Sequence, residues 1–278
     1  MESVANDFSV QNLAHVDGVF KYLEDGPGKP VRYQYKPEPD ETRARRELLA
    51  HTLPVYDGRP IARELTLDTQ GFAMRRHEVA INDFYDSQEV KNTYYPEIER
   101  LVMEFTGAKK VVVFDHNLRS GRKSGEPGIK EPVRYVHNDY TVKSGPQRVR
   151  DLLSPDEAEA RLQRRFAMIN VWRPIAGPVL EAPLGVCDAR SIAPRDFMPT
   201  DLKYRDRIGE IYSFAFNPAH RWFYFPHMQP DEALFLKCFD SADDGRAKFT
   251  AHSAFEDPAT PPDAPPRESI EARTIVFW

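Results

Sequence analysis

Two histidines and one aspartate have the types and spacing of a metal site. His137 and Asp139 are two residues apart in the segment RYVHNDYT. On a β-strand, where side chains alternate between faces, both would point the same way. His252 lies in an aromatic-flanked segment that is also typical of a strand. Two imidazoles and one carboxylate form the facial ligand set that leaves three positions of an octahedral iron open for a bidentate co-substrate and O2. The H-x-D pattern alone fits a surface ion pair equally well.

Two residues near the C-terminus have the chemistry of a carboxylate-binding site. Arg267 and Ser269 open the last predicted strand and, being two residues apart, share one of its faces. A guanidinium can bind a carboxylate with a forked pair of hydrogen bonds, and a serine hydroxyl can add a third. Tyr135 shares the face predicted for the H-x-D pair, so we place it in the same cofactor-binding group.

The elements that must position these residues are mostly short β-strands. After residue 165, β-branched and aromatic segments alternate with turn residues at short intervals. This spacing favours a sandwich or a jelly-roll barrel over a βαβ fold. The predicted strands are 166–172, 184–189, 210–216, 221–225, 233–239, 248–255 and 268–278.

The N-terminal half is predicted to combine strands and helices. Residues 1–85 form a β-rich layer, with strand-like segments at 31–35 and 64–68. Apolar residues recur at helical spacing over 87–105, where Gly107 ends the helix and Pro96 kinks it or starts a new segment.

Further predicted elements flank the metal-site segment. Strands are predicted over 109–118 and 133–142, and a helix over 154–165 is capped by Ser154. The Gly-, Ser-, Lys- and Pro-rich segment 120–132 is a surface loop that either closes over the site or is simply solvated.

Composition excludes several classes of protein. The net charge of −5, without a block of basic residues, argues against nucleic-acid binding. No apolar run is long enough to span a membrane, and the N-terminal segment lacks the pattern of a signal peptide. Cys187 and Cys238 are too few for a disulfide framework, which suits the cytoplasm. We expect a single domain over 1–278, in which 86–278 supply the helices and the jelly-roll core.

The motifs together resemble a known enzyme family. H-x-D, a distal histidine and then R-x-S on the closing strand are similar to the non-heme Fe(II)/2-oxoglutarate-dependent dioxygenases, whose fold is a double-stranded β-helix. Longer segments of the sequence resemble the hydroxylase/desaturase branch of this family. That branch includes gibberellin desaturase-like, aspergillic-acid-pathway and cephalosporin-methoxylation-like proteins. The segments that carry this resemblance are 92–96, 113–119, 136–141, 170–174 and 252–273.

The resemblance implies a function and a set of roles. His137, Asp139 and His252 would bind Fe(II), while Arg267 and Ser269 would hold the distal carboxylate of 2-oxoglutarate. With O2, the enzyme would convert 2-oxoglutarate to succinate and CO2 and would hydroxylate, desaturate or cyclise a small molecule, in secondary metabolism. Two alternatives stay open: a jelly-roll metal oxidase that does not use 2-oxoglutarate, and a non-catalytic barrel that binds a ligand. The sequence leaves the substrate and the oligomeric state open.

Other residues are rival or additional candidates for the site. His227 with Lys237 is an alternative distal ligand and carboxylate binder. Arg273 is a rival of Arg267 that is more simply a barrel-surface residue or a structural partner of an acid. Substrate contacts are expected among residues near the metal strand and at the end of the 166–172 strand, where alternation puts Asn170 and Trp172 on one face and Arg173 on the other. These candidates are His116, Arg119, Asn170, Trp172 and Arg173.

Overall fold

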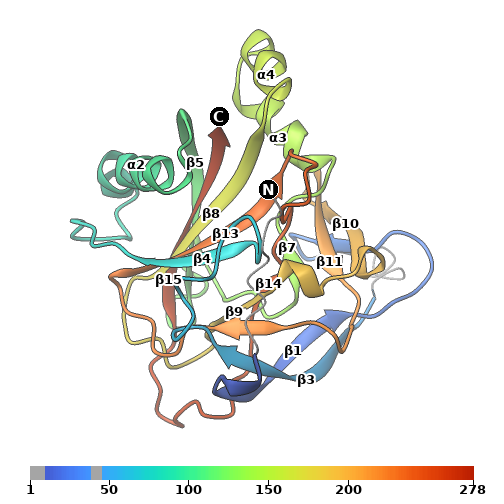
Figure 1. The fold of residues 1–278 in the computed structure, drawn as a ribbon, viewed down its shortest axis with the longest axis vertical. Helices are drawn as coiled ribbons and strands as arrows, with labels where there is room; N and C mark the ends of the chain where they lie inside the picture. The colour runs from blue at the N-terminus through green and yellow to red at the C-terminus, as the bar shows by residue number, and fades with distance from the viewer. Residues whose placement is uncertain (1–9, 39–45) are drawn as a thin grey trace.

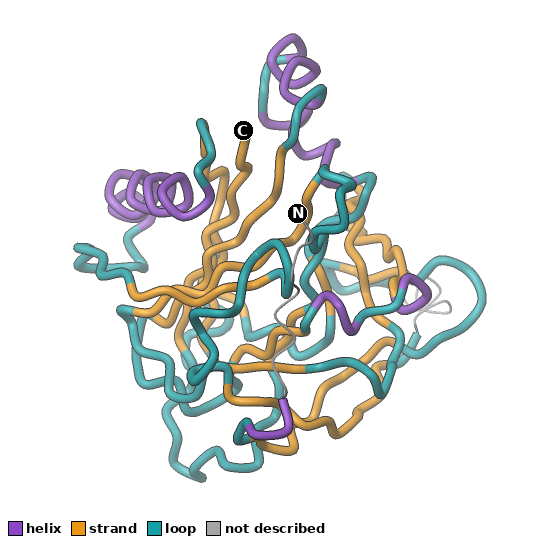
Figure 2. Tube along the Cα trace, in the orientation of Figure 1, coloured by secondary structure: helices purple, strands orange, loops and turns teal. Residues whose placement is uncertain are grey.

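A computed structural model describes residues 10–38 and 46–278 of the chain. Among these residues, two β-sheets face each other in a jelly roll, with the helices at the periphery (Figures 1 and 2). The nine-stranded sheet runs, in spatial order, β1 (His15–Leu23), β3 (Leu48–Asp57), β12 (Trp222–Tyr224), β9 (Leu184–Cys187), β14 (His252–Ala254), β7 (His137–Asn138), β11 (Ile208–Phe214), β10 (Phe197–Lys203) and β2 (Val31–Tyr33). The six-stranded sheet runs β4 (Phe72–Arg76), β13 (Glu232–Asp240), β8 (Phe166–Pro174), β15 (Glu268–Phe277), β5 (Lys110–Ser120) and β6 (Ile129–Lys130).

The helical elements are few and short. They are the 3-10 turns η1 (Val10–Asn12), η4 (Ala189–Ser191) and η5 (Pro194–Asp196), the helix α1 (Ser87–Glu89), the π-helical segment η3 (Val90–Tyr94), and the helices α2 (Tyr95–Thr106), α3 (Ser144–Leu152) and α4 (Pro155–Leu162). No helix among the described residues is long and apolar enough to span a bilayer. The fold is therefore mainly β with supporting helices, as predicted.

Apolar side chains from both sheets fill the space between them. Met168 and Trp172 of β8 and Leu236 of β13 pack with Val186 of β9 and Phe223 of β12 in one buried cluster. Because alternate residues of a strand point to opposite faces, polar side chains at the inward positions are enclosed by this core. The functional site lies between the sheets because its polar side chains occupy inward positions of the strands.

The outer face of the six-stranded sheet is covered by η3 and α2, and Figure 1 shows α2 beside β5. Ile98 and Val102 of α2 pack against this face. Pro96 stands in the first turn of α2, directly after the π-helical segment, so it starts a new segment as predicted. Gly107 ends α2 in the left-handed conformation, with φ of 68°, which glycine adopts without steric cost.

Three predicted strands were wrong in whole or in part. Residues 64–68 form turns, in which Thr66 accepts hydrogen bonds from the backbone of Thr69, Gln70 and Gly71. The predicted strand 248–255 is limited to β14. The predicted strand 133–142 is limited to β7, because Asn138 uses its side-chain amide to bind the carbonyl of Tyr140 and so bends the chain.

Other elements differ from the predictions in detail. The α4 helix is present, but the Ser154 side chain makes no capping hydrogen bond. The loop 120–132 contains β6, which pairs in parallel with β5. The helix α3 and the strand β10 were not predicted, and β10 contains Pro199, which interrupts a strand pattern.

Replacing Gly71 by alanine is expected to destabilise the segment that leads into β14. Gly71 has a φ of +88°, and an added Cβ would lie 2.3 Å from Oγ1 of Thr250. The left-handed backbone costs about 1–2 kcal/mol for a residue with a Cβ, and the overpacking adds about 1–3 kcal/mol. Thermal unfolding should show a lowered midpoint. The control is Gly245→Ala, where φ is +92° and an added Cβ meets no atom within 4 Å. An equal decrease of the unfolding midpoint in both variants would show that the close approach to Thr250 does not add to the destabilisation.

Candidate metal centre

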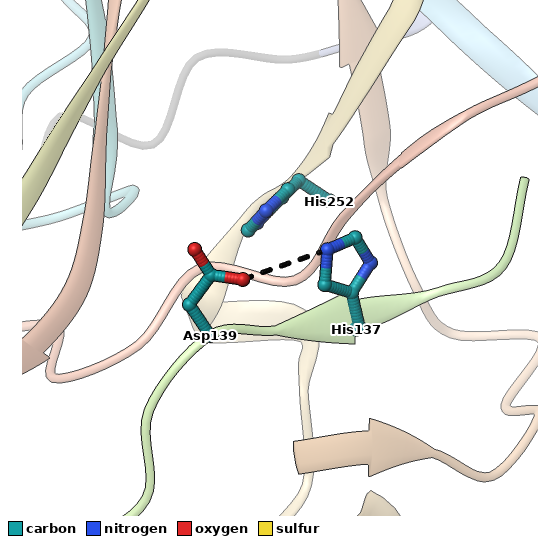
Figure 3. Close-up of side chains that lie close together, drawn as sticks. All are labelled: His137, Asp139 and His252. Atoms are coloured by element: carbon teal, nitrogen blue, oxygen red, sulfur yellow. Dashed lines mark ion pairs between the residues drawn. The ribbon is translucent and has the colours of Figure 1, made fainter. Parts of the chain in front are cut away.

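The structure brings His137, Asp139 and His252 together between the two sheets. One potential ligand atom from each lies within 4.8 Å of the others. Figure 3 shows the two imidazoles and the carboxylate pointing toward one another. His137 and His252 are Cα partners on the neighbouring strands β7 and β14, so the pairing of two short strands positions both rings. Asp139 follows β7 directly, and its Oδ1 lies 3.7 Å from His137 Nε2.

Backbone carbonyls hold both imidazoles in one orientation. Nδ1 of His137 lies 2.9 Å from the carbonyl oxygen of Tyr135, and Nδ1 of His252 lies 3.0 Å from that of Thr250. Since a carbonyl oxygen only accepts, each Nδ1 carries the proton and donates it. Each Nε2 therefore keeps a free lone pair, which is the form in which histidine binds a metal ion.

The surroundings also set the charge of His137 and Asp139. Burial, together with the neighbouring His252, lowers the pKa of His137 to about 3, so its imidazole is neutral at neutral pH. Burial would raise the pKa of Asp139, but the two imidazoles and Arg273 outweigh it and hold that pKa below its usual range. Neutral imidazoles and an ionised carboxylate are the ligand forms that a divalent metal ion requires. The donor set therefore fits Fe(II).

Asn170 of β8 connects the aspartate to a fourth polar residue. Its Nδ2 donates to Oδ2 of Asp139 and to Oε1 of Glu271, both at 2.8 Å. Burial and the negative charge of Asp139 raise the pKa of Glu271. Hydrogen bonds of this kind orient a metal-binding carboxylate.

Replacing Asn170 by alanine is expected to weaken metal binding, because Asp139 loses the hydrogen bond that orients its carboxylate. Loss of such an outer partner typically reduces metal affinity by roughly 10- to 100-fold. Titration of the metal-free protein with Fe(II) under anaerobic conditions measures the change. The control is Asn92→Ala, an exposed asparagine of η3. An unchanged affinity in the Asn170 variant would show that this hydrogen bond does not organise the site.

The same pocket contains the predicted carboxylate binder. Arg267 lines the pocket together with the three residues of the metal site. Its guanidinium donates to the carbonyl of Ala182 and lies 5.4 Å from the ring of Trp172. Burial, and after it the positive charge of nearby Arg119, lowers the pKa of Arg267 to about 9. A buried cation in such a place favours an anionic ligand.

Among the described residues, one buried polar atom of each predicted carboxylate binder lacks a partner, and so does Oδ1 of the neighbouring Asn170. Nε of Arg267 and the hydroxyl of Ser269 have no hydrogen-bond partner among the residues that the structure describes. Buried polar groups are normally satisfied, so these two donors are available to bind a ligand. A carboxylate would accept from both atoms, and the residues present therefore fit 2-oxoglutarate.

The other predicted site residues divide between the two faces of the six-stranded sheet. Asn170 and Trp172 point inward, and Trp172 lines the pocket. Arg173 lies on the opposite face, where it contacts His77 and the ring of Tyr94, so the structure does not bring it to the metal site.

Of the remaining candidates, Arg119 and Tyr135 lie at the site and His116 does not. Arg119 of β5 lines the pocket. The ring of Tyr135 is 5.0 Å from that of His137 and lies under the guanidinium of Arg32. His116 points to the outer face of the sheet, where Nδ1 lies 2.8 Å from the hydroxyl of Tyr95.

The rival ligand pair is not at this site. His227 lies in a turn with a φ of 54°. Lys237 is buried in ion pairs with Asp68 and Asp240. Neither residue lines the pocket that contains the histidine and aspartate cluster.

Arg273 is a structural partner of an acid, which is one of the two roles expected for it. It forms an ion pair with Asp115, which also lies 3.5 Å from Arg148. Arg273 shares the inward face of β15 with Glu271, a residue that the sequence analysis missed. The alternation that starts at Arg267 and Ser269 would have identified both positions.

A larger cleft of about 780 Å3 opens beside Asp139. Helix α3 forms one wall, and the strands β10 and β11 with their connecting turn form the other. Both charged and apolar side chains line it, among them Asp139, Tyr140, Arg148, Leu202, Tyr204 and Ile208. The cleft is large enough for a small organic molecule and ends at the metal site.

Comparison with known proteins gives consistent matches over nearly the whole chain. A family model described as "Oxidoreductase/YMDC permease-like domain" matches residues 20–277. The chain is 33% identical over 267 residues to the Fe(II)/2-oxoglutarate-dependent dioxygenase nvfI of Aspergillus novofumigatus, covering 93% of this chain and 95% of that protein. It is 31% identical over 286 residues to the hydroxylase/desaturase efuI of Hormonema carpetanum, covering 94% and 91%.

A solved structure is similar as well. The iron and alpha-ketoglutarate-dependent endoperoxidase NvfI superposes with a TM-score of 0.88 at 30% sequence identity. The superposition covers 95% of this chain and 98% of that one. The sequence comparison and the structure comparison therefore both identify NvfI as similar to this chain.

Proposed function

The chain belongs to the family of Fe(II)/2-oxoglutarate-dependent dioxygenases that includes hydroxylase/desaturases, and from this premise we propose the roles of its residues. His137, Asp139 and His252 bind Fe(II), and Arg267 with Ser269 binds the distal carboxylate of 2-oxoglutarate. The observation that supports this assignment is that one pocket contains both the metal-ligand cluster and Arg267, whose buried Nε has no partner among the described residues.

The enzyme oxidises a small molecule and releases succinate and CO2 from 2-oxoglutarate. The bound iron supplies the activation of O2 that this oxidation needs. Hydroxylation, desaturation and ring closure all fit the site, and the relatives include hydroxylase/desaturases and an endoperoxidase. A role in secondary metabolism follows from the similarity to fungal enzymes such as the aspirochlorine biosynthesis protein N of Aspergillus oryzae.

Hydrogen bonds within the chain orient the proposed metal ligands without any contribution from a substrate. Two backbone carbonyls orient the imidazoles of His137 and His252, so both Nε2 atoms face the metal position. Asn170 fixes the carboxylate of Asp139 from the opposite sheet. Trp172 packs against Arg267 and excludes water from one side of the anion site.

The substrate is proposed to lie in the cleft beside Asp139. This places the carbon to be oxidised next to the metal while leaving the 2-oxoglutarate pocket on the other side. The whole chain, residues 1–278, acts as one oxygenase domain. A cytoplasmic location fits the two buried thiols, Cys187 and Cys238, which are both free.

Two measurements test the proposed function. Under anaerobic conditions, Fe(II) and 2-oxoglutarate together should produce a weak visible charge-transfer band that neither produces alone. In air, the loaded enzyme should convert 2-oxoglutarate to succinate. Oxygen consumption that does not depend on 2-oxoglutarate would instead support an oxidase without this co-substrate, and the absence of any band and any succinate would support a non-catalytic binding protein.

A further inference from the structure

We infer that Arg119 is a second guanidinium for the distal carboxylate of 2-oxoglutarate, opposite Arg267. The inference rests on the proposed function, because it assigns a further residue to the same co-substrate. Two arginines, Arg119 on β5 and Arg267 directly before β15, line one small pocket beside the metal-ligand cluster.

The strand register places Arg119 beside the proposed carboxylate binders. Arg119 of β5 is the Cα partner of Ser269 on β15, and Arg267 lies two residues before Ser269. Cross-strand partners on the same face have Cβ atoms about 4.5–5.5 Å apart. Ser269 on β15 therefore lies beside Arg119 and two residues from Arg267, and the two arginines line the same small pocket.

A β-bulge explains why Arg119 points inward. Val113 pairs with Thr274 while Asp115 pairs with Arg273, so Phe114 is an extra residue in β5. Before the bulge, Val113 packs against the outer apolar cluster beneath α2. After it, Asp115 and Arg119 point between the sheets.

Most of the hydrogen-bonding capacity of Arg119 remains free. Of the five N–H donors of its guanidinium, one nitrogen, Nη1, donates to the carbonyl of Glu131 at 2.8 Å. Among the described residues it forms no other hydrogen bond and no ion pair, although the acidic Glu271 lines the same pocket. The guanidinium can therefore donate to a bound anion without breaking an existing contact.

The charge of the pocket favours an anion between the two arginines. Burial, followed by the positive charge of Arg119, lowers the pKa of Arg267, so the two guanidinium groups repel each other across the pocket. A carboxylate between them would turn this repulsion into two attractive contacts. 2-Oxoglutarate also carries two negative charges. A metal ion would bind only the 2-oxo acid end, which leaves the distal carboxylate for the two arginines.

The test compares two ligands that differ only in the distal carboxylate. 2-Oxoglutarate and 2-oxopentanoate have the same length and the same 2-oxo acid end, but 2-oxopentanoate has a methyl group in place of the distal carboxylate. Calorimetric titration of both into Mn(II)-loaded protein gives the preference for 2-oxoglutarate. We expect Arg119→Gln to reduce that preference roughly 10- to 100-fold and Arg119→Lys to reduce it less.

The control is Arg122→Gln. Arg122 lies three residues further along the chain, and its exposed side chain pairs with the largely buried Glu268. The preference of this variant should equal that of the original protein. The inference would be overturned if Arg119→Gln leaves the preference unchanged, whether both ligands bind more weakly or neither does. That result is expected if Arg119 binds the 2-oxo acid end or only holds the 120–132 loop. If Arg119→Gln does not fold, an undiminished preference in the Arg119→Lys variant has the same meaning. Failure of the unaltered protein to bind 2-oxoglutarate at all would instead overturn the proposed function.

Discussion

His252→Ala protein is expected to lose the charge-transfer band and the formation of succinate. His252 is 2% exposed, and its ring centroid lies 4.4 Å from that of His137. Among the described residues, these two histidines and Asp139 form the cluster that could hold a metal ion. Because outer partners of metal ligands already contribute about 10- to 100-fold to metal affinity, removing a ligand should cost more than about 100-fold. Anaerobic absorption spectra of the Fe(II)- and 2-oxoglutarate-treated variant measure the loss.

The rival histidine provides the matched control. His227→Ala changes a residue outside the pocket and should keep both the band and the succinate yield. A circular-dichroism melting curve of each variant confirms that it is folded. A band that survives in His252→Ala protein and disappears in His227→Ala protein would reverse the assignment of the distal ligand.

Arg267→Gln is expected to lose 2-oxoglutarate affinity while keeping the metal ion. Arg267 is 3% exposed, and truncating one partner of a buried charge pair costs about 2–5 kcal/mol. That range corresponds to a roughly 30-fold to several-thousand-fold weaker affinity. Titration of Fe(II)-loaded protein with 2-oxoglutarate should show the weaker binding, whereas Fe(II) titration without 2-oxoglutarate should give an unchanged affinity.

The control for Arg267 is Lys237→Gln, which removes the alternative carboxylate binder. Lys237 is paired with Asp68 and Asp240, so this change lowers the stability of the protein but should leave the affinity of the folded protein for 2-oxoglutarate intact. If the Arg267 variant binds 2-oxoglutarate normally and the Lys237 variant does not, the co-substrate lies elsewhere in the fold. Oxygen consumption that both variants retain, independent of 2-oxoglutarate, would favour the oxidase alternative.

Much of the site could be predicted because its chemistry depends on residue types at short spacing. The H-x-D pair, the distal histidine and the R-x-S pair each occupy one short segment. Within such a segment, strand alternation gives the facing of Arg267 and Ser269 without knowledge of distant residues. The same alternation correctly placed Asn170 and Trp172 on one face of β8 and Arg173 on the other.

Features that depend on distant parts of the chain could not be predicted in this way. Asp139 reaches the site although its segment is mostly not a strand, because Asn138 binds the carbonyls of both Tyr140 and Cys238 and bends the chain. Residues Asn170 and Glu271 come from two other strands of the opposite sheet. Their contacts require the two sheets to be in place first.

The sequence by itself therefore determined the ligand types, their order along the chain and the mainly β architecture, because these follow from local alternation and residue chemistry. The tertiary structure alone decided which side chains share a pocket. The bulge at Phe114 is the clearest case: uninterrupted alternation would place Val113 and Arg119 on the same face of β5, yet they point to opposite faces. One extra residue reverses the facing of all later residues in a strand, and pairing with β15 determines where that residue is accommodated.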